Sequence, residues 1–211
     1  MRNLILTGLA VVLMAGFAQA TVWYETFESS TDKHPKTVST YASAWDNVQT
    51  SYVTDPKTQG NKSMKITAEK TESSAAGAIV VAIDLEDSFN MEGTDTRCEL
   101  RTENGNIYNW DVLFFDSAGY FEKFSYTPAA DGTWLNSRSV QGSGSATGGY
   151  DYSDVTDITI YAWVGKTTAT DVEIYLDGCW SNDPVPEPAT LGILAMGGAA
   201  LVVRRRRKKL A

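Results

Sequence analysis

Residues 97–101 (RCELR) form the stretch of this sequence best suited to chemistry. Alternation along a β-strand places Arg97, Glu99 and Arg101 on one face, where two cations could neutralise an acidic sugar. General acid–base catalysis also needs a proton carrier within reach of the substrate. The only histidine, His34, lies far upstream. We therefore interpret these residues as a salt-bridged strand face, and we predict no catalytic residues.

Aromatic side chains suggest a second kind of chemistry, because a sugar ring stacks on a flat aromatic face. Residues 158–164 (ITIYAWV) alternate, so that Thr159, Tyr161 and Trp163 share one strand face. We expect Tyr161 and Trp163 to stack on a sugar, with Trp110 as a third stacking residue of lower priority. The alternative is that these rings pack beneath a loop or against a neighbouring strand.

The charge of the chain is unevenly distributed. All 26 Asp and Glu lie between Glu25 and Glu187, whereas only 11 of the 18 Lys and Arg lie in that stretch. The middle of the chain therefore carries −15, and such an acidic body repels phosphate backbones, which argues against nucleic-acid binding. One histidine and two cysteines also exclude the usual zinc, Cys-His nucleophile and iron–sulfur sites.

Residues 1–20 have the three parts of a secretory signal peptide. Arg2 supplies the positive charge, residues 4–17 are almost wholly apolar, and the segment ends in the small-x-small pattern of Ala18 and Ala20. An uncleaved membrane helix is the alternative, but the apolar run is shorter than the roughly 20 residues that a span needs. We predict recognition of Ala18 and Ala20, cleavage after Ala20, and export of the chain.

Residues 184–211 form a second ordered segment at the C-terminus. A Pro-Glu-Pro motif is followed by an apolar stretch at 189–203, predicted as a transmembrane helix, and then by an Arg/Lys cluster at 204–209. Snorkelling arginines extend the reach of the short apolar stretch, and the positive-inside bias fixes the C-terminus in the cytoplasm. A plain tail anchor with a proline stop is the simpler alternative.

This layout resembles the PEP-CTERM sorting signal. The resemblance implies that an exosortase, a membrane cysteine protease, is a partner of the chain and releases it from the inner membrane. It also implies a Gram-negative-type envelope, with the processed protein at the cell surface or in an extracellular matrix of exopolysaccharide and biofilm. The residues that carry the recognition are Pro186, Glu187, Pro188, Arg204, Arg205, Arg206 and Arg207.

Residues 21–183 show no sustained helical period. They contain short runs rich in Val, Ile, Thr and aromatic residues, broken by Gly, Asn, Asp and Pro. About ten short strands in one domain predict an all-β antiparallel β-sandwich, a jelly roll. We expect a hairpin turn at 116–119 and a flexible loop at 142–149. The predicted strands are 22–27, 45–53, 63–68, 76–85, 96–102, 107–115, 120–126, 134–140, 158–164 and 172–179.

The order of several loose motifs in this body is similar to that of galactose-binding-like jelly rolls among carbohydrate-binding modules. Such modules open with a Phe-Glu strand, here Phe27-Glu28, and close with a strand like residues 172–177 (VEIYLD). The resemblance implies a sugar-binding domain. It also implies a structural calcium near the first and last strands, with Glu28 and Asp177 as ligands. Ordinary surface charge is the alternative for these two carboxylates.

Cys98 and Cys179 are the only thiols, and export would place both in an oxidising compartment. We predict a disulfide between them. Strict alternation puts Cys179 on the face opposite Leu176, which opposes the pairing, but Gly178 could break that alternation.

Together these features predict an exported envelope or matrix protein whose non-catalytic jelly roll binds polysaccharide. A structural or adhesin-like surface protein without a defined sugar ligand is the main alternative. A divergent glycan-active enzyme is disfavoured by the missing acid–base residues.

Overall fold

The computed structural model describes residues 20–25, 27, 34–58, 60–72, 75–104, 106–166 and 170–183. The two terminal helices predicted from the sequence lie outside the described residues. Within the part of the chain that is described, no helix is long and apolar enough to cross a membrane.

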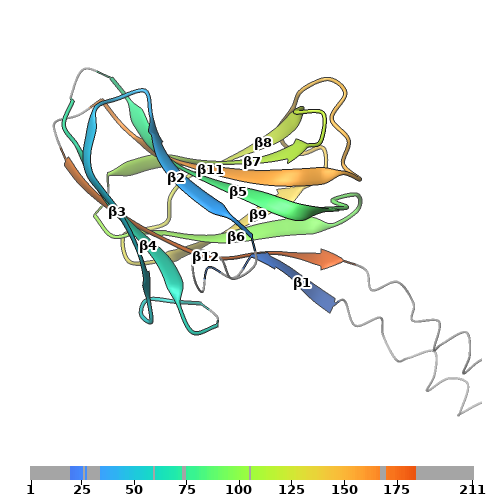
Figure 1. The fold of residues 1–211 in the computed structure, drawn as a ribbon, viewed down its shortest axis with the longest axis horizontal. Helices are drawn as coiled ribbons and strands as arrows, with labels where there is room; N and C mark the ends of the chain where they lie inside the picture. The colour runs from blue at the N-terminus through green and yellow to red at the C-terminus, as the bar shows by residue number, and fades with distance from the viewer. Residues whose placement is uncertain are drawn as a thin grey trace, which may run out of the picture. The chain divides into compact units, whose positions relative to one another are not determined.

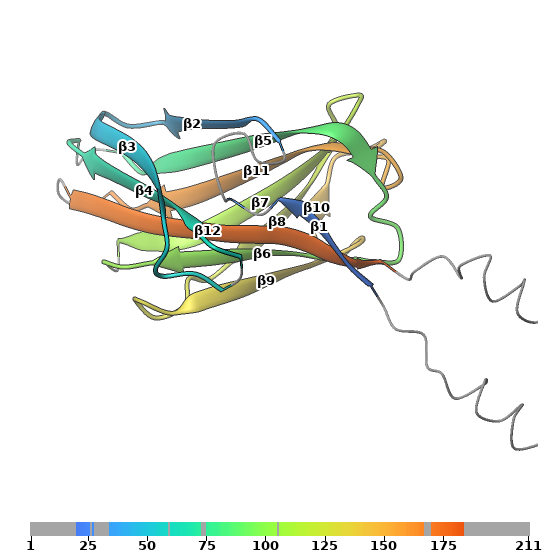
Figure 2. The same ribbon diagram turned by 60° about the horizontal axis from the view of Figure 1, so that its bottom comes forward.

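The described residues form two facing β-sheets (Figures 1 and 2). Sheet A has the strand order β3-β4-β12-β6-β9, with β1 paired to β12, and sheet B has the order β10-β8-β7-β11-β5-β2. Every pairing with a described register is antiparallel. This confirms the predicted all-β sandwich. The strands are β1 (Ala20–Glu25), β2 (Lys36–Tyr41), β3 (Trp45–Val53), β4 (Ser63–Lys70), β5 (Gly77–Phe89), β6 (Asp95–Thr102), β7 (Ile107–Asp116), β8 (Phe121–Tyr126), β9 (Trp134–Val140), β10 (Ser145–Ala146), β11 (Val155–Val164) and β12 (Thr170–Asp183).

The core lies between the sheets and is built by alternation along each strand. In β11, Ile158, Ile160, Ala162 and Val164 are at most 1% exposed, whereas the residues between them are only half-buried. In the neighbouring strands Ile160 lies opposite Val81 and Val112, so this inward row is apolar across the three strands. Burying such side chains contributes about 1.5–3 kcal/mol each. The inward and outward faces predicted for this strand are confirmed.

Two strands were not predicted from the sequence. β2 is mostly exposed, and within it Val38 alone packs against the core, opposite Val81 of β5. β10 is only two residues long and lies inside the predicted flexible loop, where it pairs with Lys123 and Glu122 of β8. Both are edge strands, and neither carries a hydrophobic alternation of its own. Their strand conformation comes from the pairing with β5 and β8.

The turn between β7 and β8 has the predicted hairpin chemistry. The backbone N–H of Gly119 donates to the carbonyl of Asp116 at 2.9 Å, and Gly119 has a φ of 83°. The Asp116 carboxylate, itself 3% exposed, accepts the N–H groups of Ala118 and Tyr120. The turn therefore has its own internal hydrogen bonds, and it fixes the register of the two strands.

Gly178 interrupts the alternation of β12. It has a φ of 51°, and the register shifts between Asp177 and Cys179. A glycine allows this conformation without the steric cost that a side chain would add. The consequence is that Asp177 lies opposite Glu99, while Cys179 lies opposite Cys98 on the core side.

Candidate functional site

Three aromatic rings gather on the outer face of sheet B, and we call them the aromatic platform: Tyr41, Tyr161 and Trp163. The rings of Tyr161 and Trp163 are stacked, with centroids 5.8 Å apart and an interplanar angle of 13°. Tyr41 stands edge-on to both, at 6.3 and 5.8 Å. Ala78 lies opposite both Tyr41 and Trp163, and its small side chain leaves room for the rings above it.

Asp111 of β7 holds the platform in place. Its carboxylate, on a residue only 7% exposed, accepts the indole N–H of Trp163 at 2.9 Å. It also accepts the side-chain amide of Asn109 at 2.7 Å and the hydroxyl of Ser125 at 2.5 Å. Hydrogen bonds to a charged acceptor are stronger than those to a neutral one. Asp111 is therefore a positioning residue that fixes the indole ring.

The platform combines flat apolar faces with polar groups at their edges. Tyr41 is 54% exposed, and Tyr161 and Trp163 are half-buried, so ring surface remains open to solvent. Burial raises the pKa of the Tyr161 hydroxyl above its usual value, with Tyr41 and Asp111 adding to the effect, so this hydroxyl stays protonated at neutral pH. Such a surface can stack on a ring and hydrogen bond to its substituents.

Sequence reasoning identified two of the three rings of the platform. Tyr41 was missed because the strand that carries it was not predicted, and Asp111 was missed because its role depends on the pairing of β7 with β11. The only sequence signal for Tyr41 is its place at the end of a short run rich in Thr and Val, residues 36–41.

Trp110 is not part of the platform, and its assignment as a stacking residue is wrong. It is 1% exposed and lies opposite Ala162 on the core side of sheet B. Alternation places its neighbours Asn109 and Asp111 on the outer face, so Trp110 must point inward. A buried indole cannot face a ligand in solution.

Arg97, Glu99 and Arg101 share the outer face of sheet A, as predicted, and they form a network of ion pairs and hydrogen bonds. Arg101 pairs with Glu103, and Arg97 lies 3.9 Å from a carboxylate oxygen of Asp95. Glu99 accepts the Asn136 amide at 2.6 Å. Burial raises the pKa of Glu99, the charge of Asp177 adds to this rise, and the Asn136 hydrogen bond opposes it. The expected salt-bridged face is confirmed.

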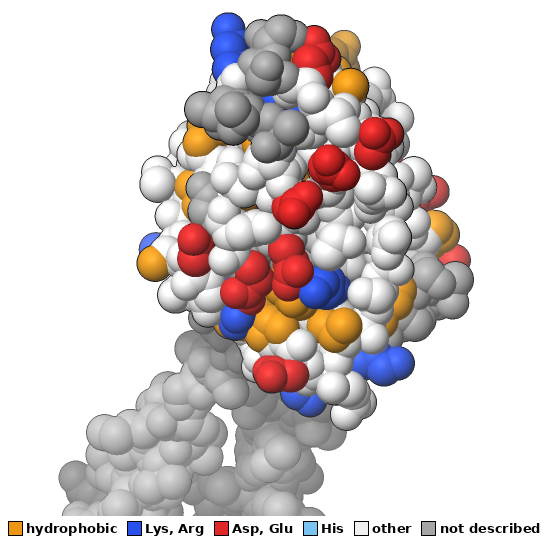
Figure 3. All heavy atoms as spheres, turned by 90° about the vertical axis from the view of Figure 1, so that its left-hand side faces the viewer, with side chains coloured by type: hydrophobic (Ala, Val, Ile, Leu, Met, Phe, Trp, Pro, Cys, Tyr) orange, Lys and Arg blue, Asp and Glu red, His pale blue; other side chains and the backbone are white. Residues whose placement is uncertain are grey.

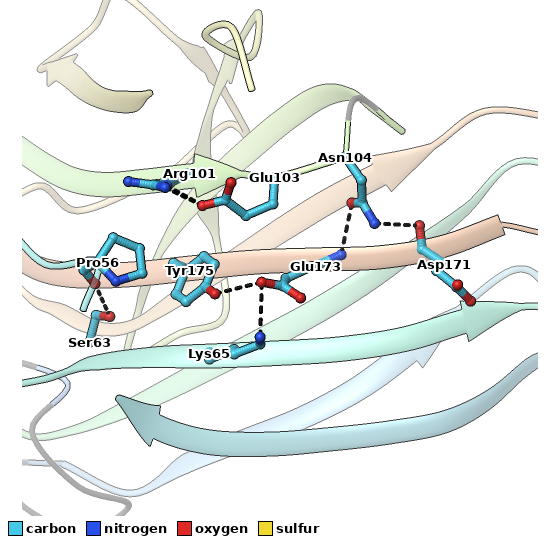
Figure 4. A network of polar contacts seen from close by, with 9 residues as sticks. All are labelled: Pro56, Ser63, Lys65, Arg101, Glu103, Asn104, Asp171, Glu173 and Tyr175. Atoms are coloured by element: carbon cyan, nitrogen blue, oxygen red, sulfur yellow. Dashed lines mark hydrogen bonds and ion pairs between the residues drawn. The ribbon is translucent and has the colours of Figure 1, made fainter. Parts of the chain in front are cut away.

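The same face continues across β12 into a polar network (Figure 4). Lys65 lies 2.9 Å from Glu173, which also accepts the hydroxyl of Tyr175 at 2.5 Å. The hydrogen bond with Glu173 raises the pKa of Lys65 despite partial burial. The Asn104 side chain accepts the backbone N–H of Glu173 and donates to the carbonyl of Asp171. These partners satisfy each other, so we interpret the network as structural.

The two cysteines are brought together by the bulge in β12. Their sulfurs lie 2.6 Å apart, and both residues are buried beneath sheet A. Gly178 thus removes the obstacle that strict alternation raised. The disulfide stays a prediction.

The proposed calcium ligands are only partly described. Asp177 is fully buried, and its carboxylate accepts the backbone N–H and the hydroxyl of Thr58, the latter at 2.8 Å. Asp177 is therefore not an exposed surface charge. Glu28 lies outside the described residues. Among the residues that are described, no group of three or more His, Cys, Asp or Glu is arranged to hold a metal.

The comparison with protein families identifies the C-terminal segment. Residues 184–207 match the PEP-CTERM protein-sorting motif, which confirms the resemblance of the tail and implies export with a membrane-anchored C-terminal sorting signal. The recognition residues from Pro186 to Arg207 lie outside the described part of the chain, as does Ala18, whereas Ala20 begins β1. Among curated proteins, none matches this chain in sequence.

The body shares its fold with jelly-roll carbohydrate-binding modules. A family 11 module from Clostridium thermocellum, solved with a β-1,3-1,4-mixed-linked tetrasaccharide, matches with a TM-score of 0.55 at 13% identity, covering 78% of this chain and 96% of that one. A family 30 module of a cellulosomal cellulase from the same organism matches with a TM-score of 0.52 at 11% identity, covering 79% and 99%. An exo-β-agarase matches with a TM-score of 0.52 at 12% identity, covering 78% of this chain and 25% of that one.

Proposed function

We propose that this chain is an exported surface protein whose β-sandwich binds polysaccharide on the aromatic platform without cleaving it. The observation that carries the proposal is the stacked pair of Tyr161 and Trp163 on the outer face of sheet B. The two ring planes are nearly parallel and the residues are two positions apart in one strand, so the pair extends over about 7 Å of the outer face and keeps part of its ring surface open to solvent. Asp111 holds the indole in this orientation before a ligand arrives, which lowers the entropic cost of binding.

The fold supports this proposal. The family 11 module of the same fold was solved with a bound tetrasaccharide, so the architecture is compatible with glycan binding. At 13% identity the comparison extends to the fold and not to the residues of a site. The argument for this chain therefore depends on its own rings and on the exposed surface that they retain.

The sorting motif supports a location for this function. We propose that an exosortase processes the tail near Pro186, Glu187 and Pro188 while the apolar segment at 189–203 holds the protein in the inner membrane. The released body would then reside at the cell surface or in an exopolysaccharide matrix. A platform that binds polysaccharide would retain it there after the membrane anchor has been removed.

Structural calcium is a further part of the proposal. Calcium takes six to eight oxygen ligands, and the two carboxylates Asp177 and Glu99 lie opposite each other with little exposure. Since the described residues do not complete a metal site, Glu28 would have to supply another carboxylate. A cation at this place would offset the repulsion between Asp177 and Glu99.

A structural envelope protein without a sugar ligand is the second candidate. It is favoured by the edge-on contacts of Tyr41 with both other rings, since a cluster that packs against itself needs no ligand. A glycan array probed with the full-length chain in detergent, with and without calcium, separates the two. Retention of one class of glycan supports the platform, and no retention supports the structural candidate. Release of shortened products would instead indicate an enzyme.

A further inference from the structure

Three hollows on the described surface have similar volumes and different charges. Two of them, of about 380 and 350 Å³, are lined by carboxylates and by no Lys or Arg. The third, of about 360 Å³, is lined by two cations and by no Asp or Glu, and we call it the basic hollow. Acidic side chains are spread over the face seen in Figure 3, and the basic hollow differs from that face because its only charged lining residues are cations. Its lining includes Lys123, Ser125, Tyr126, Arg138, Ser143 and Ser145.

The basic hollow lies two strands away from the aromatic platform along one row of sheet B. Ser125, in its lining, lies opposite Asp111, and Asp111 lies opposite Tyr161. Neighbouring strands are about 4.8 Å apart, so about 10 Å separate the Tyr161 and Ser125 positions. A polysaccharide that lies across the strands, with one sugar on the rings, therefore reaches the hollow with a later sugar of the same chain.

The walls of the hollow are fixed by contacts within the protein. Glu122 is fully buried and accepts the N–H groups of Gly142 and Gly144, the latter at 2.9 Å. A Cβ at Gly144 would lie 2.6 Å from the carbonyl oxygen of Lys123, so the loop lies directly against β8. The hydroxyls of Tyr126 and Ser139, 2.6 Å apart, join β8 to β9 across the two sheets. A site held in this way needs little ordering when a ligand binds.

The two cations keep donors for a ligand. The Lys123 ammonium is 3.8 Å from Asp111, which is beyond hydrogen-bond distance, and its side chain is 41% exposed. The Arg138 side chain is 60% exposed and donates from Nε to Asp95 at 2.7 Å. A guanidinium has five N–H donors, so its terminal nitrogens can hold a carboxylate in a bidentate manner.

Three carboxylates lie close to the hollow, and their negative charges limit how much negative charge a bound ligand can carry. Asp95, Asp111 and Glu122 each already accept hydrogen bonds from the protein. The surrounding body is also acidic, although charges beyond about 10 Å are screened by salt. The site therefore suits single carboxylates spaced along a neutral backbone better than densely charged phosphate polymers.

We propose that the polysaccharide bound by this chain contains carboxylated sugars, and that Lys123 and Arg138 hold one such carboxylate in the basic hollow. This inference rests on the proposed function, because the aromatic platform supplies the other end of the binding face. It names a ligand class that neither the rings nor the fold indicates.

Binding of the full-length chain in detergent to uronic-acid polymers tests the inference. The probes are alginate and polygalacturonate, each compared with its carboxyl-reduced, neutral form, and a neutral mixed-linkage β-glucan. The variant is the double substitution Lys123→Gln and Arg138→Gln, and the matched control is Lys166→Gln, which removes an exposed cation in another loop. A Lys123→Arg variant, which keeps the charge, and thermal melts of every variant separate a loss of binding from a loss of folding.

We expect at least one acidic polymer to bind about tenfold more tightly than its reduced form at low salt. The double variant should remove this difference and leave the reduced form's binding unchanged, while Lys166→Gln and Lys123→Arg keep it. An equal affinity for both forms, or a double variant that retains the preference, overturns the inference. Binding of the β-glucan alone would overturn it and leave the proposed function standing. If the wild-type chain binds none of the polymers, this inference is wrong, and the glycan array decides whether the proposed function stands.

Discussion

Oxidation of Cys98 and Cys179 should raise the stability of the sandwich substantially. The two residues are opposite each other in β6 and β12, and 81 positions separate them in the chain. Closing a loop of this length removes about 15 cal/mol/K of entropy from the unfolded chain, or about 4.5 kcal/mol at 25 °C. Native-state strain and residual structure in the unfolded chain reduce such gains, and measured values are typically about 2–4 kcal/mol. For a domain of this size, that corresponds to a melting temperature higher by roughly 5–15 °C.

Thermal melts of the exported protein, with and without prior reduction, measure this effect. The matched control is the double substitution Cys98→Ala and Cys179→Ala, whose melting temperature should not respond to reductant. Intact mass should show the loss of two hydrogens in the wild-type chain. Two titratable thiols in protein taken from its oxidising compartment, with a melting temperature unchanged by reductant, would refute the pairing.

Three further perturbations have definite expected outcomes. Asp111→Asn should destabilise the protein by about 1–2 kcal/mol in denaturant melts. The reason is that a side-chain amide cannot accept hydrogen bonds from all three donors that contact the carboxylate. Equal stability of the variant and the wild type would contradict the positioning role. In calcium-free buffer, Glu99→Gln should stabilise the protein at pH 7, because burial raises the native pKa of Glu99 and its charged form increasingly opposes folding as the pH rises above the ordinary value of 4.5. The stability difference from wild type should vanish below that pH, and melts from pH 4 to 8 that run parallel would refute it. Chelation of calcium should lower the melting temperature, since a cation bound only to the native state stabilises that state. Glu28→Ala should abolish this response to the chelator. A melting temperature that does not change with chelator would exclude the calcium.

The arrangement of β11 could be predicted from sequence because one strand contains all the necessary information. Its alternation separates Ile158, Ile160 and Ala162 from Tyr161 and Trp163, and the structure keeps both sets where the pattern places them. The fold class followed from the same kind of signal repeated along the body. Local alternation is sufficient when a strand has one buried and one half-exposed face.

The rest of the candidate site depends on pairings that no single stretch of sequence reveals. Tyr41 reaches the platform because β2 pairs with β5, although β2 has almost no hydrophobic pattern. Asp111 contacts Trp163 because β7 and β11 are neighbours. Trp110 was named as a stacking residue because the register that places it opposite Ala162, on the core side, is not visible in its own stretch of sequence. Gly178 shifts the register of β12 by a backbone conformation that its sequence permits but does not require.

Glycan binding by platform variants of the full-length chain is the most direct test of the central claim. The variants are Trp163→Ala and Tyr161→Ala, and the control is Tyr120→Ala, which removes an exposed ring in the turn between β7 and β8. Loss of an aromatic anchor at the centre of a binding face costs about 2 kcal/mol or more. We therefore predict that Trp163→Ala weakens binding of the retained glycan about 30-fold, while Tyr120→Ala changes it less than about twofold. Unchanged binding by both platform variants would contradict the assignment of this face.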